Sequence, residues 1–385
     1  MTLLFNELLQ YIPWNTFYKY SGQLNIDKWK KKFSVQKTFL VLFLWEILKS
    51  DSIRWLLTSL EIHREQLYHM GFGKDIPKRS TISDRINKIP PIIFKNMFYE
   101  LVNTVKRNIW NNKDLKKIYA IDSSTISLWV NAFNRAFYRK SKWWIKLNTR
   151  IDLSESLPDL VEITTANKHD SKVTYQLLDW VKNGDTIVFD RWYLDYNLLN
   201  YLNKRGIFFV TRTKKNTDYC PIRMNKIENS LVLCDAECEF TQEKSFKKYP
   251  QKFRIVRYHV DNLDKDYEYI TNNLLAPAEI IADIYKQRRT IETLFKDLKQ
   301  KLKIKQFFWT SKNAVENQIR IALIYYLVMV LIKIKTFAKE SLLELFRKCR
   351  ELVFYRTTIV LLLRKPLILH DSSSDPPMLQ LSLFE

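Results

Sequence analysis

Hydrophobic positions repeat at helical spacing in the first and last parts of the chain and at strand spacing between them. Residues 1–110 therefore predict a helical N-terminal region, in which the apolar run VQKTFLVLFLWEIL forms one helix. Ser80 or Thr81 is the expected N-cap of another helix, RSTISDRINKI. Residues 311–385 predict a helical C-terminal region with a flexible end, HDSSSDPP. Its run IALIYYLVMVLI is too short to cross a bilayer and predicts a buried helix.

The middle part, residues 111–310, predicts an α/β domain. The β-branched and apolar runs KIYAIDSSTISLW, KWWIKLNTRIDL and PDLVEITTANK predict three successive strands. A helix, a strand ending in Asp190, another helix and a further strand are expected to follow. This order predicts a mixed sheet with helices packed on it. Residues 216–275 contain more strand-like pieces and predict a β-rich insertion, after which one helix is expected over 277–303.

Four polar residues share one stripe of that helix. At about 100° per residue, Tyr285, Arg288, Glu292 and Lys299 fall within a stripe about 60° wide. The stripe borders the apolar face, so Glu292 is expected to lie at the edge of the core. The apolar face consists of Ile284, Ile291, Leu294, Phe295 and Leu298, and the other basic residues on the far side are Lys286, Arg289 and Lys296.

Two aspartates interrupt or end apolar strands, where an unpaired charge is costly to bury. Asp122 lies within the first strand and Asp190 ends the fourth. If Asp122, Asp190 and Glu292 converge, their mutual repulsion calls for cations, and two Mg²⁺ ions would relieve it. Such ions activate water or a 3′-hydroxyl for in-line phosphoryl displacement. Arg288 and Lys299 would then hold DNA phosphates, and Tyr285 would donate to a phosphate or support the site.

Each of these residues also has a structural alternative. Asp122 could cap a turn before SSTIS, and Asp190 could pair with its neighbour Arg191. Glu292 and Lys296 have the i, i+4 spacing of a common surface ion pair. For any single residue the structural alternative is attractive, and the catalytic interpretation depends on all three acidic residues acting together.

Charge supports a nucleic-acid partner. The chain has 63 Lys and Arg against 41 Asp and Glu, a net charge of +22. A chain this basic commonly binds DNA, although lysine enrichment from an AT-rich genome is the alternative explanation. The four cysteines lack the spacing of a zinc site and are interpreted as reduced and structural, as in a cytoplasmic protein. The first residues lack the pattern of a signal peptide, and no membrane partner is expected.

The spacing Tyr285-x2-Arg288-x3-Glu292-x6-Lys299 resembles the Y-R-E-K signature of the insertion-sequence transposases of the IS-four family. AIDSSTISL is similar to the family's segment with the first catalytic Asp, and VFDRWYLDY to the segment with the second, usually D-R-G-Y. The resemblance extends over nearly the whole chain, including LYHMGF and SKNAV.

The resemblance implies an RNase H-like core with a β-rich insertion and a cut-and-paste DNA transposase. It implies that Asp122, Asp190 and Glu292 are catalytic and hold two Mg²⁺ ions, for which Mn²⁺ is expected to substitute. Double-stranded DNA, as terminal inverted repeats and target, would be the partner, bound by a homodimer in the bacterial cytoplasm at the nucleoid. The expected DNA-binding residues are Tyr285, Arg288, Lys299, Arg191 and Tyr193.

The sequence also departs from the family pattern. Trp192 stands where the family usually has Gly, and Trp143, Trp144 and Trp309 occupy or adjoin other usual Gly positions. Asn148 replaces a frequent His. A decaying copy, or a stop codon translated as Trp, would explain the tryptophans, and the codons would decide. Two other functions are therefore alternatives. The protein could be an inactive copy that acts only as a DNA-binding protein, or a host nuclease that shares the core.

Overall fold

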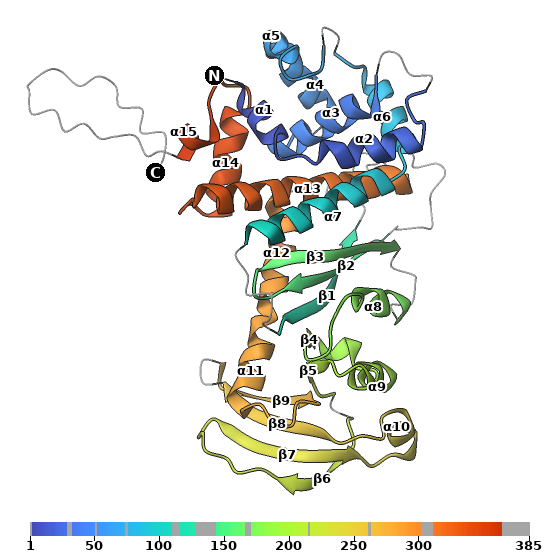
Figure 1. Ribbon diagram of the computed structural model, residues 1–385, viewed down its shortest axis with the longest axis vertical. Helices are drawn as coiled ribbons and strands as arrows, with labels where there is room; N and C mark the ends of the chain where they lie inside the picture. Colours follow the sequence, from blue (N-terminus) through green and yellow to red (C-terminus); the bar gives the residue numbers. More distant parts are fainter. Residues whose placement is uncertain are drawn as a thin grey trace, which may run out of the picture.

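A mixed sheet of nine strands runs through the part of the molecule that the structure, a computed structural model, describes (Figure 1). The described residues are 2–28, 33–50, 52–73, 76–109, 116–127, 144–165, 171–214, 216–260, 263–301 and 311–363. The strand order is β3-β2-β1-β4-β5-β9-β8-β7-β6. The strands are β1 (Ile118–Ser127), β2 (Trp144–Asp152), β3 (Leu157–Thr165), β4 (Thr186–Phe189), β5 (Phe208–Arg212), β6 (Tyr219–Met224), β7 (Val232–Phe240), β8 (Phe253–Val260) and β9 (Lys265–Thr271).

The central strands are parallel and the outer ones antiparallel. β1 pairs antiparallel with β2 and parallel with β4, and β4 pairs parallel with β5. β9 pairs antiparallel with β5, with Val210 opposite Thr271. The predicted α/β class and mixed sheet are confirmed, and the segment predicted as a β-rich insertion continues the same sheet.

Helices from both ends of the chain form one layer above the sheet (Figure 1). α13 packs on α7, α3 and α6, and one hydrophobic cluster includes side chains from all four helices. The predicted buried helix is confirmed as part of α13. The helices of this layer are α1 (Leu4–Leu9), α2 (Trp14–Gln23), α3 (Val35–Leu48), α4 (Ile53–Ile62), α5 (Arg64–Leu67), α6 (Arg79–Lys88), α7 (Ile92–Asn108), α13 (Lys312–Thr336), α14 (Leu342–Leu352) and α15 (Ile359–Leu363).

Other helices cover the two faces of the sheet. α8 (Ser171–Leu177) and α9 (Tyr196–Lys204) lie on one face, and α11 (Ala278–Gln287) and α12 (Arg289–Lys301) run along the other toward the helical layer (Figure 1). α10 (Glu243–Lys248) packs near α9 and β7. In the described part of the chain, no helix combines the length and hydropathy needed to span a membrane.

Two local predictions are wrong. The helix of RSTISDRINKI begins at Arg79 with Lys78 as N-cap and no side-chain cap bond, so Ser80 and Thr81 lie inside it. The helix expected over 277–303 is broken at Arg288 into α11 and α12. The predicted flexible end HDSSSDPP lies outside the described residues.

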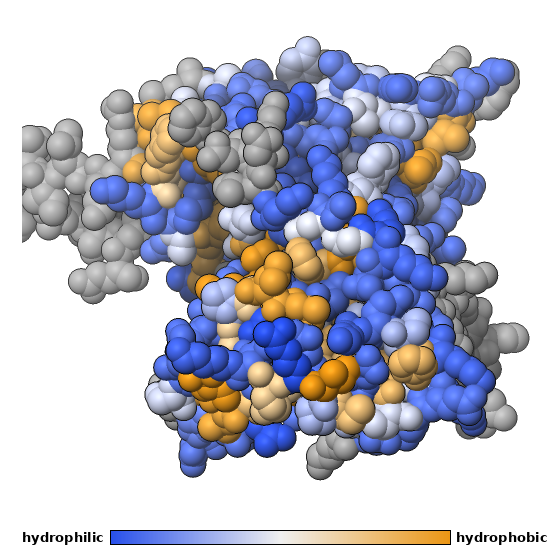
Figure 2. All heavy atoms as spheres, turned by 60° about the horizontal axis from the view of Figure 1, so that its bottom comes forward, coloured by the Kyte–Doolittle hydropathy of each residue, from blue (hydrophilic) through white to orange (hydrophobic). Residues whose placement is uncertain are grey.

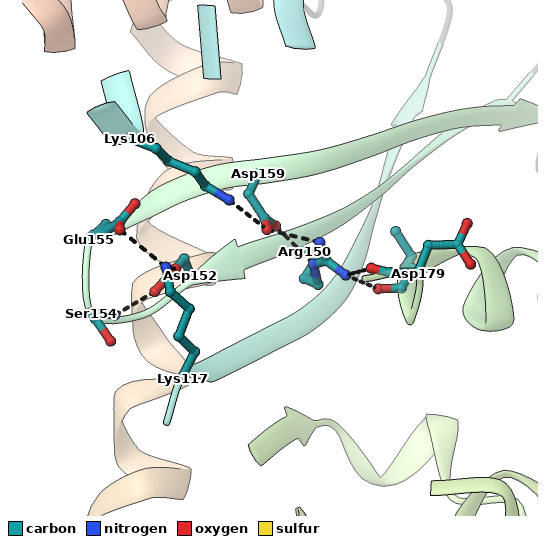
Figure 3. A network of polar contacts seen from close by, with 9 residues as sticks. Lys106, Lys117, Arg150, Asp152, Ser154, Glu155, Asp159 and Asp179 are labelled. Atoms are coloured by element: carbon teal, nitrogen blue, oxygen red, sulfur yellow. Dashed lines mark hydrogen bonds and ion pairs between the residues drawn. The ribbon is translucent and has the colours of Figure 1, made fainter. Parts of the chain in front are cut away.

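A buried ion-pair network fixes the sheet to its helices (Figure 3). Arg150 on β2 is 4% exposed and donates to both carboxylate oxygens of Asp159 on β3, each at 2.9 Å. It also donates to the carbonyls of Leu177 and Asp179 at the end of α8, at 2.8 and 2.5 Å. Lys106 of α7 reaches Asp159 at 3.3 Å. One arginine therefore links two strands and a helix.

The face shown in Figure 2 is mostly hydrophilic, and hydrophobic residues lie across its middle and in several smaller patches among the hydrophilic ones. All four cysteines carry free thiols, and only Cys220 among them is exposed.

Candidate active site

Asp122 lies in the middle of β1, which pairs parallel with β4 on one side and antiparallel with β2 on the other. It stands opposite Thr149 of β2 and accepts a hydrogen bond from the backbone N–H of Ser123 at 2.7 Å. β1 continues to Ser127, so Asp122 does not cap a turn before SSTIS. Its side chain is half-buried, with 19% exposed. The strand therefore presents a carboxylate that needs a partner.

Asp190 follows the last residue of β4 directly. In the parallel pairing of β1 and β4, Ile121 stands opposite Phe189, so Asp122 and Asp190 occupy adjacent positions on neighbouring strands. The carboxylate of Asp190 accepts a hydrogen bond from the N–H of Trp192 at 3.1 Å and so caps the 3₁₀ turn η1 (Arg191–Tyr193). Two carboxylates thus meet where β4 ends beside β1, and the carboxyl ends of parallel strands are where α/β sheets commonly bind ligands.

Arg288 joins these two aspartates to Glu292. Its guanidinium lies 3.1 Å from Asp122 and 3.7 Å from Asp190, and it also pairs with Glu292. The side chains of Arg288 and Asp190 are 13% and 23% exposed, so the cluster is partly shielded from water. The structure therefore places all three predicted acidic residues around one cation. Glu292 and Asp190 both pair with Arg288. Among the described residues, Glu292 forms no ion pair with Lys296, and Asp190 forms none with Arg191.

The break between α11 and α12 positions this arginine. The N–H of Arg288 donates to the carbonyl of Tyr285, and the N–H of Ile291 donates to the carbonyl of Arg288, both at 3.1 Å. These i, i+3 bonds tighten the helix at one residue. On either side of it, the predicted apolar face is confirmed. The buried side chains are Ile284, Ile291, Leu294, Phe295 and Leu298, and the exposed basic ones are Lys286, Arg289 and Lys296.

Burial and nearby charges both shift the pKa values of the groups in this cluster. Burial is the largest influence on Asp122 and raises the pKa of its carboxyl above the usual value. The Ser123 N–H and Arg288 oppose this rise in pKa, whereas the neighbouring carboxylates Asp190 and Glu292 add to it. Burial alone would lower the pKa of Arg288, but the surrounding acidic groups raise it. The cluster is therefore a set of carboxylates that holds a guanidinium cation between them.

The donor set fits divalent metal ions by its chemistry. Three carboxylates supply the hard oxygen ligands that Mg²⁺ prefers. When all three are ionised, one guanidinium neutralises a single charge, and two negative charges remain. Within the described residues, no group of three or more His, Cys, Asp or Glu is arranged to hold a metal ion. Asp122, Asp190 and Glu292 would therefore rearrange when they exchange the guanidinium for a metal ion.

The remaining predicted site residues lie around this cluster with different exposures. Tyr285 packs on Tyr269, with ring centroids 5.0 Å apart, and the guanidinium of Arg288 lies 5.7 Å from its ring. Arg191 and Tyr193 are half-buried in the turn after Asp190. Lys299 belongs to α12, but its side chain lies outside the described part of the structure.

Sequence reasoning missed two features of arginine placement. Arg288 was assigned only to DNA, whereas here it is the counter-ion of the acidic residues. Arg212 ends β5, beside the end of β4, and lies 4.4 Å over the ring of Tyr267. The available signal was a basic residue at the end of a predicted strand, IFFVTRTKK.

The unusual tryptophan at the site is compatible with the backbone. Trp192 lies in η1 and is not among the described residues with positive φ, so its position does not require glycine. Asn148 is buried in β2 and donates to Thr164 at 3.0 Å and to the carbonyl of Glu162 at 3.3 Å. Trp143 and Trp309 lie outside the described residues, as does the side chain of Trp144.

The fold and the site define a mixed α/β protein with an acidic cluster beside the end of the parallel strand β4. Residues 113–328 match the family described as "Transposase DDE domain", and residues 2–73 match a domain of unknown function, DUF4372. Since the first match covers more than half of the 385 residues, the chain belongs to the DDE-domain transposase family.

The chain is also similar to curated proteins that are named as transposases. The chain is 28% identical to a probable transposase for insertion sequence element IS5377 of Geobacillus stearothermophilus, over 65% of this chain and 66% of that protein. It is 29% identical to putative transposase y4zB of Sinorhizobium fredii, over 66% and 71%. It is 25% identical to a putative transposase for insertion sequence element IS4SA of Synechocystis, over 83% and 88%.

A solved structure, the piggyBac transposase synaptic complex with hairpin DNA, aligns with a TM-score of 0.43 and 13% identity. The alignment covers 94% of this chain and 80% of that chain. Similarity at this level carries no argument about the fold or the site.

Proposed function

We propose that this protein is a DNA transposase that cleaves and joins the strands of an insertion sequence in a metal-dependent, cut-and-paste reaction. The observation that carries the proposal is the convergence of Asp122, Asp190 and Glu292, from three separate elements, on the guanidinium of Arg288. The strand order β3-β2-β1-β4-β5 supports assignment of the core to the RNase H-like class.

In this proposal Asp122, Asp190 and Glu292 hold two Mg²⁺ ions, and Mn²⁺ substitutes for them. Bound metal ions of this kind activate the attacking oxygen and stabilise the leaving oxygen in phosphoryl transfer. Arg288 leaves the carboxylates and grips a phosphate of the DNA strand with its planar fork. Tyr285, beside Arg288, keeps that guanidinium at the site. Lys299, Arg191 and Tyr193 add contacts to the DNA.

The substrate we propose is double-stranded DNA, first the terminal inverted repeats and then the target. The net charge of +22 supports a polyanionic partner. We assign residues 1–110 to DNA binding, 111–310 to catalysis and 311–385 to a supporting helical region. A homodimer bound to DNA at the bacterial nucleoid completes the proposal.

The test is cleavage of a supercoiled plasmid that carries the sequences flanking the gene. Asp122→Asn, Asp190→Asn and Glu292→Gln are each expected to abolish Mg²⁺-dependent cleavage and to leave binding of the end DNA largely intact. Asp283→Asn is the matched control, because Asp283 is an exposed carboxylate on α11 outside the cluster. Cleavage by any of the three variants at the wild-type rate would contradict the assignment.

The same assay separates the competing functions. An inactive, DNA-binding copy would bind the end DNA without cutting it. A host nuclease would cut DNA without preference for inverted repeats, and the gene would lack such repeats on its flanks. The normal backbone of Trp192 removes one reason for treating this copy as damaged.

A further inference from the structure

Thr149 of β2 is a buried threonine that stands directly opposite Asp122 of β1. The residue is 0% exposed, and among the described residues its hydroxyl has no hydrogen-bond partner. We propose that Thr149 is a positioning residue, whose hydroxyl donates a hydrogen bond to the Asp122 carboxylate when the acidic cluster releases Arg288 and binds divalent metal ions. This inference rests on the proposed function.

The side chains of Thr149 and Asp122 share the face of the sheet that α12 covers. Directly opposite residues of an antiparallel pair point to the same face, with their Cβ atoms about 4.5–5.5 Å apart. Leu147, two positions before Thr149 and on the same face, belongs to one hydrophobic cluster with Ile291 of α12. The helix that carries Glu292 therefore lies over both residues. At this separation, rotation about the two Cα–Cβ bonds can bring the hydroxyl to hydrogen-bond distance from the carboxylate, about 2.5–3.0 Å.

The Asp122 carboxylate has other partners in this structure. One oxygen accepts a hydrogen bond from the N–H of Ser123 at 2.7 Å, and the other accepts one from Arg288 at 3.1 Å. An ionised carboxylate has about four acceptor positions, so departure of the guanidinium leaves room for another donor. A hydrogen bond from Thr149 would fix the orientation of the carboxylate, as donors around metal-binding carboxylates commonly do.

The shape of threonine does not account for this residue by itself. A β-branched side chain suits a strand, but valine has the same shape and buries no hydroxyl, which is costly without a partner. Thr211 of β5 is also 0% exposed, and its hydroxyl also lacks a partner within the described part of the chain. However, Thr211 stands opposite Ile270 of β9, whereas Thr149 stands opposite a carboxylate of the cluster. Thr211 is therefore the matched control.

The experiment measures Mn²⁺ binding by isothermal titration calorimetry, without DNA, for wild type, Thr149→Val and Thr211→Val. Thr149→Val is expected to weaken Mn²⁺ binding about 10- to 100-fold, the usual effect of removing a hydrogen-bond partner from a metal ligand. Its unfolding temperature in EDTA is expected to equal or exceed that of wild type, because the variant no longer buries an unpartnered hydroxyl. Thr211→Val should bind Mn²⁺ within about twofold of wild type.

Thr149→Ser and Thr149→Ala form a second pair, which differs only by the hydroxyl. The serine variant should keep Mn²⁺ affinity within about threefold of wild type, and the alanine variant should bind as weakly as Thr149→Val. Equal Mn²⁺ affinities for wild type and Thr149→Val would overturn the inference while metal binding itself stands. If Thr149→Val did not fold, equal affinities for the serine and alanine variants would overturn it in the same way. Failure of wild-type protein to bind Mn²⁺ would instead overturn the proposed metal-dependent function, and the inference with it.

Discussion

Replacement of Arg288 by glutamine tests whether this arginine is the counter-ion of the acidic cluster. The change removes the one charge that lies 3.1 Å from Asp122 and 3.7 Å from Asp190 and that also pairs with Glu292. At an effective dielectric constant near 20, two unit charges at such distances interact by about 4–5 kcal/mol. Removal of one partner from a buried pair costs about 3–5 kcal/mol. Because Glu292 is 53% exposed and water screens part of the cluster, we expect a loss of about 3 kcal/mol.

The measurement is urea denaturation followed by circular dichroism in EDTA, for wild type, Arg288→Gln and Arg289→Gln. Arg289 is an exposed neighbour on the same helix and carries the same charge, so its loss should change stability by less than about 0.5 kcal/mol. Added Mn²⁺ should stabilise Arg288→Gln more than wild type, because the metal ion no longer competes with a guanidinium. A loss of under about 1 kcal/mol for Arg288→Gln, or equal stabilisation of both proteins by Mn²⁺, would refute the reasoning.

Three further predictions concern the rest of the chain. Arg150→Ala should destabilise the fold by about 3–5 kcal/mol in the same denaturation assay, since it leaves Asp159 buried and short of its two closest hydrogen bonds; an effect below about 1 kcal/mol would contradict the role of this network. Burial raises the pKa of Cys238 and Cys349 to about 12, so the stabilisation from their neutral thiols is present below pH 9.0 and declines as the pH rises toward 12. A thiol reagent at mildly alkaline pH should therefore modify exposed Cys220 rapidly and these two only after unfolding, and peptide mapping would show any exception. Burial raises the pKa of Glu46 well above 4.5, so stability that its neutral form contributes in acid is lost as the pH rises; Glu46→Gln should raise the thermal unfolding temperature above neutral pH but not in acid.

Local pattern was sufficient to predict the strands and the helix faces. Apolar and β-branched runs predicted β1 to β5, and the apolar stripe of 284–298 is buried as its spacing required. Asp122 and Asp190 could be singled out because a carboxylate within or at the end of an apolar strand is costly to bury. Their adjacent positions depend on the parallel pairing of β1 with β4, and the sequence predicted only that the sheet is mixed.

The pattern of hydrophobic and polar residues could not predict the long-range contacts. Arg288 contacts an aspartate 166 residues earlier in the chain, and no local spacing encodes that distance. The helix break at Arg288 has neither Gly nor Pro to announce it, so tertiary contacts override the helical propensity of this segment. The partner of β9 was equally hidden, because strand pairing depends on which edge is available after the core forms.

The hydrogen bonds between β5 and β9 join the outer strands β9, β8, β7 and β6 to the central strands in one continuous sheet. A force applied at β6 or β7 would pass through hydrogen-bonded strands to the end of β4, with no hinge in between. We expect the nine-stranded sheet to twist as a whole and not to bend toward Asp190. We expect motion instead at Arg288, the single residue between α11 and α12, where a small rotation would move its guanidinium relative to the three carboxylates. Amide exchange should therefore be slow and uniform across β4, β5 and β9, and faster around residue 288.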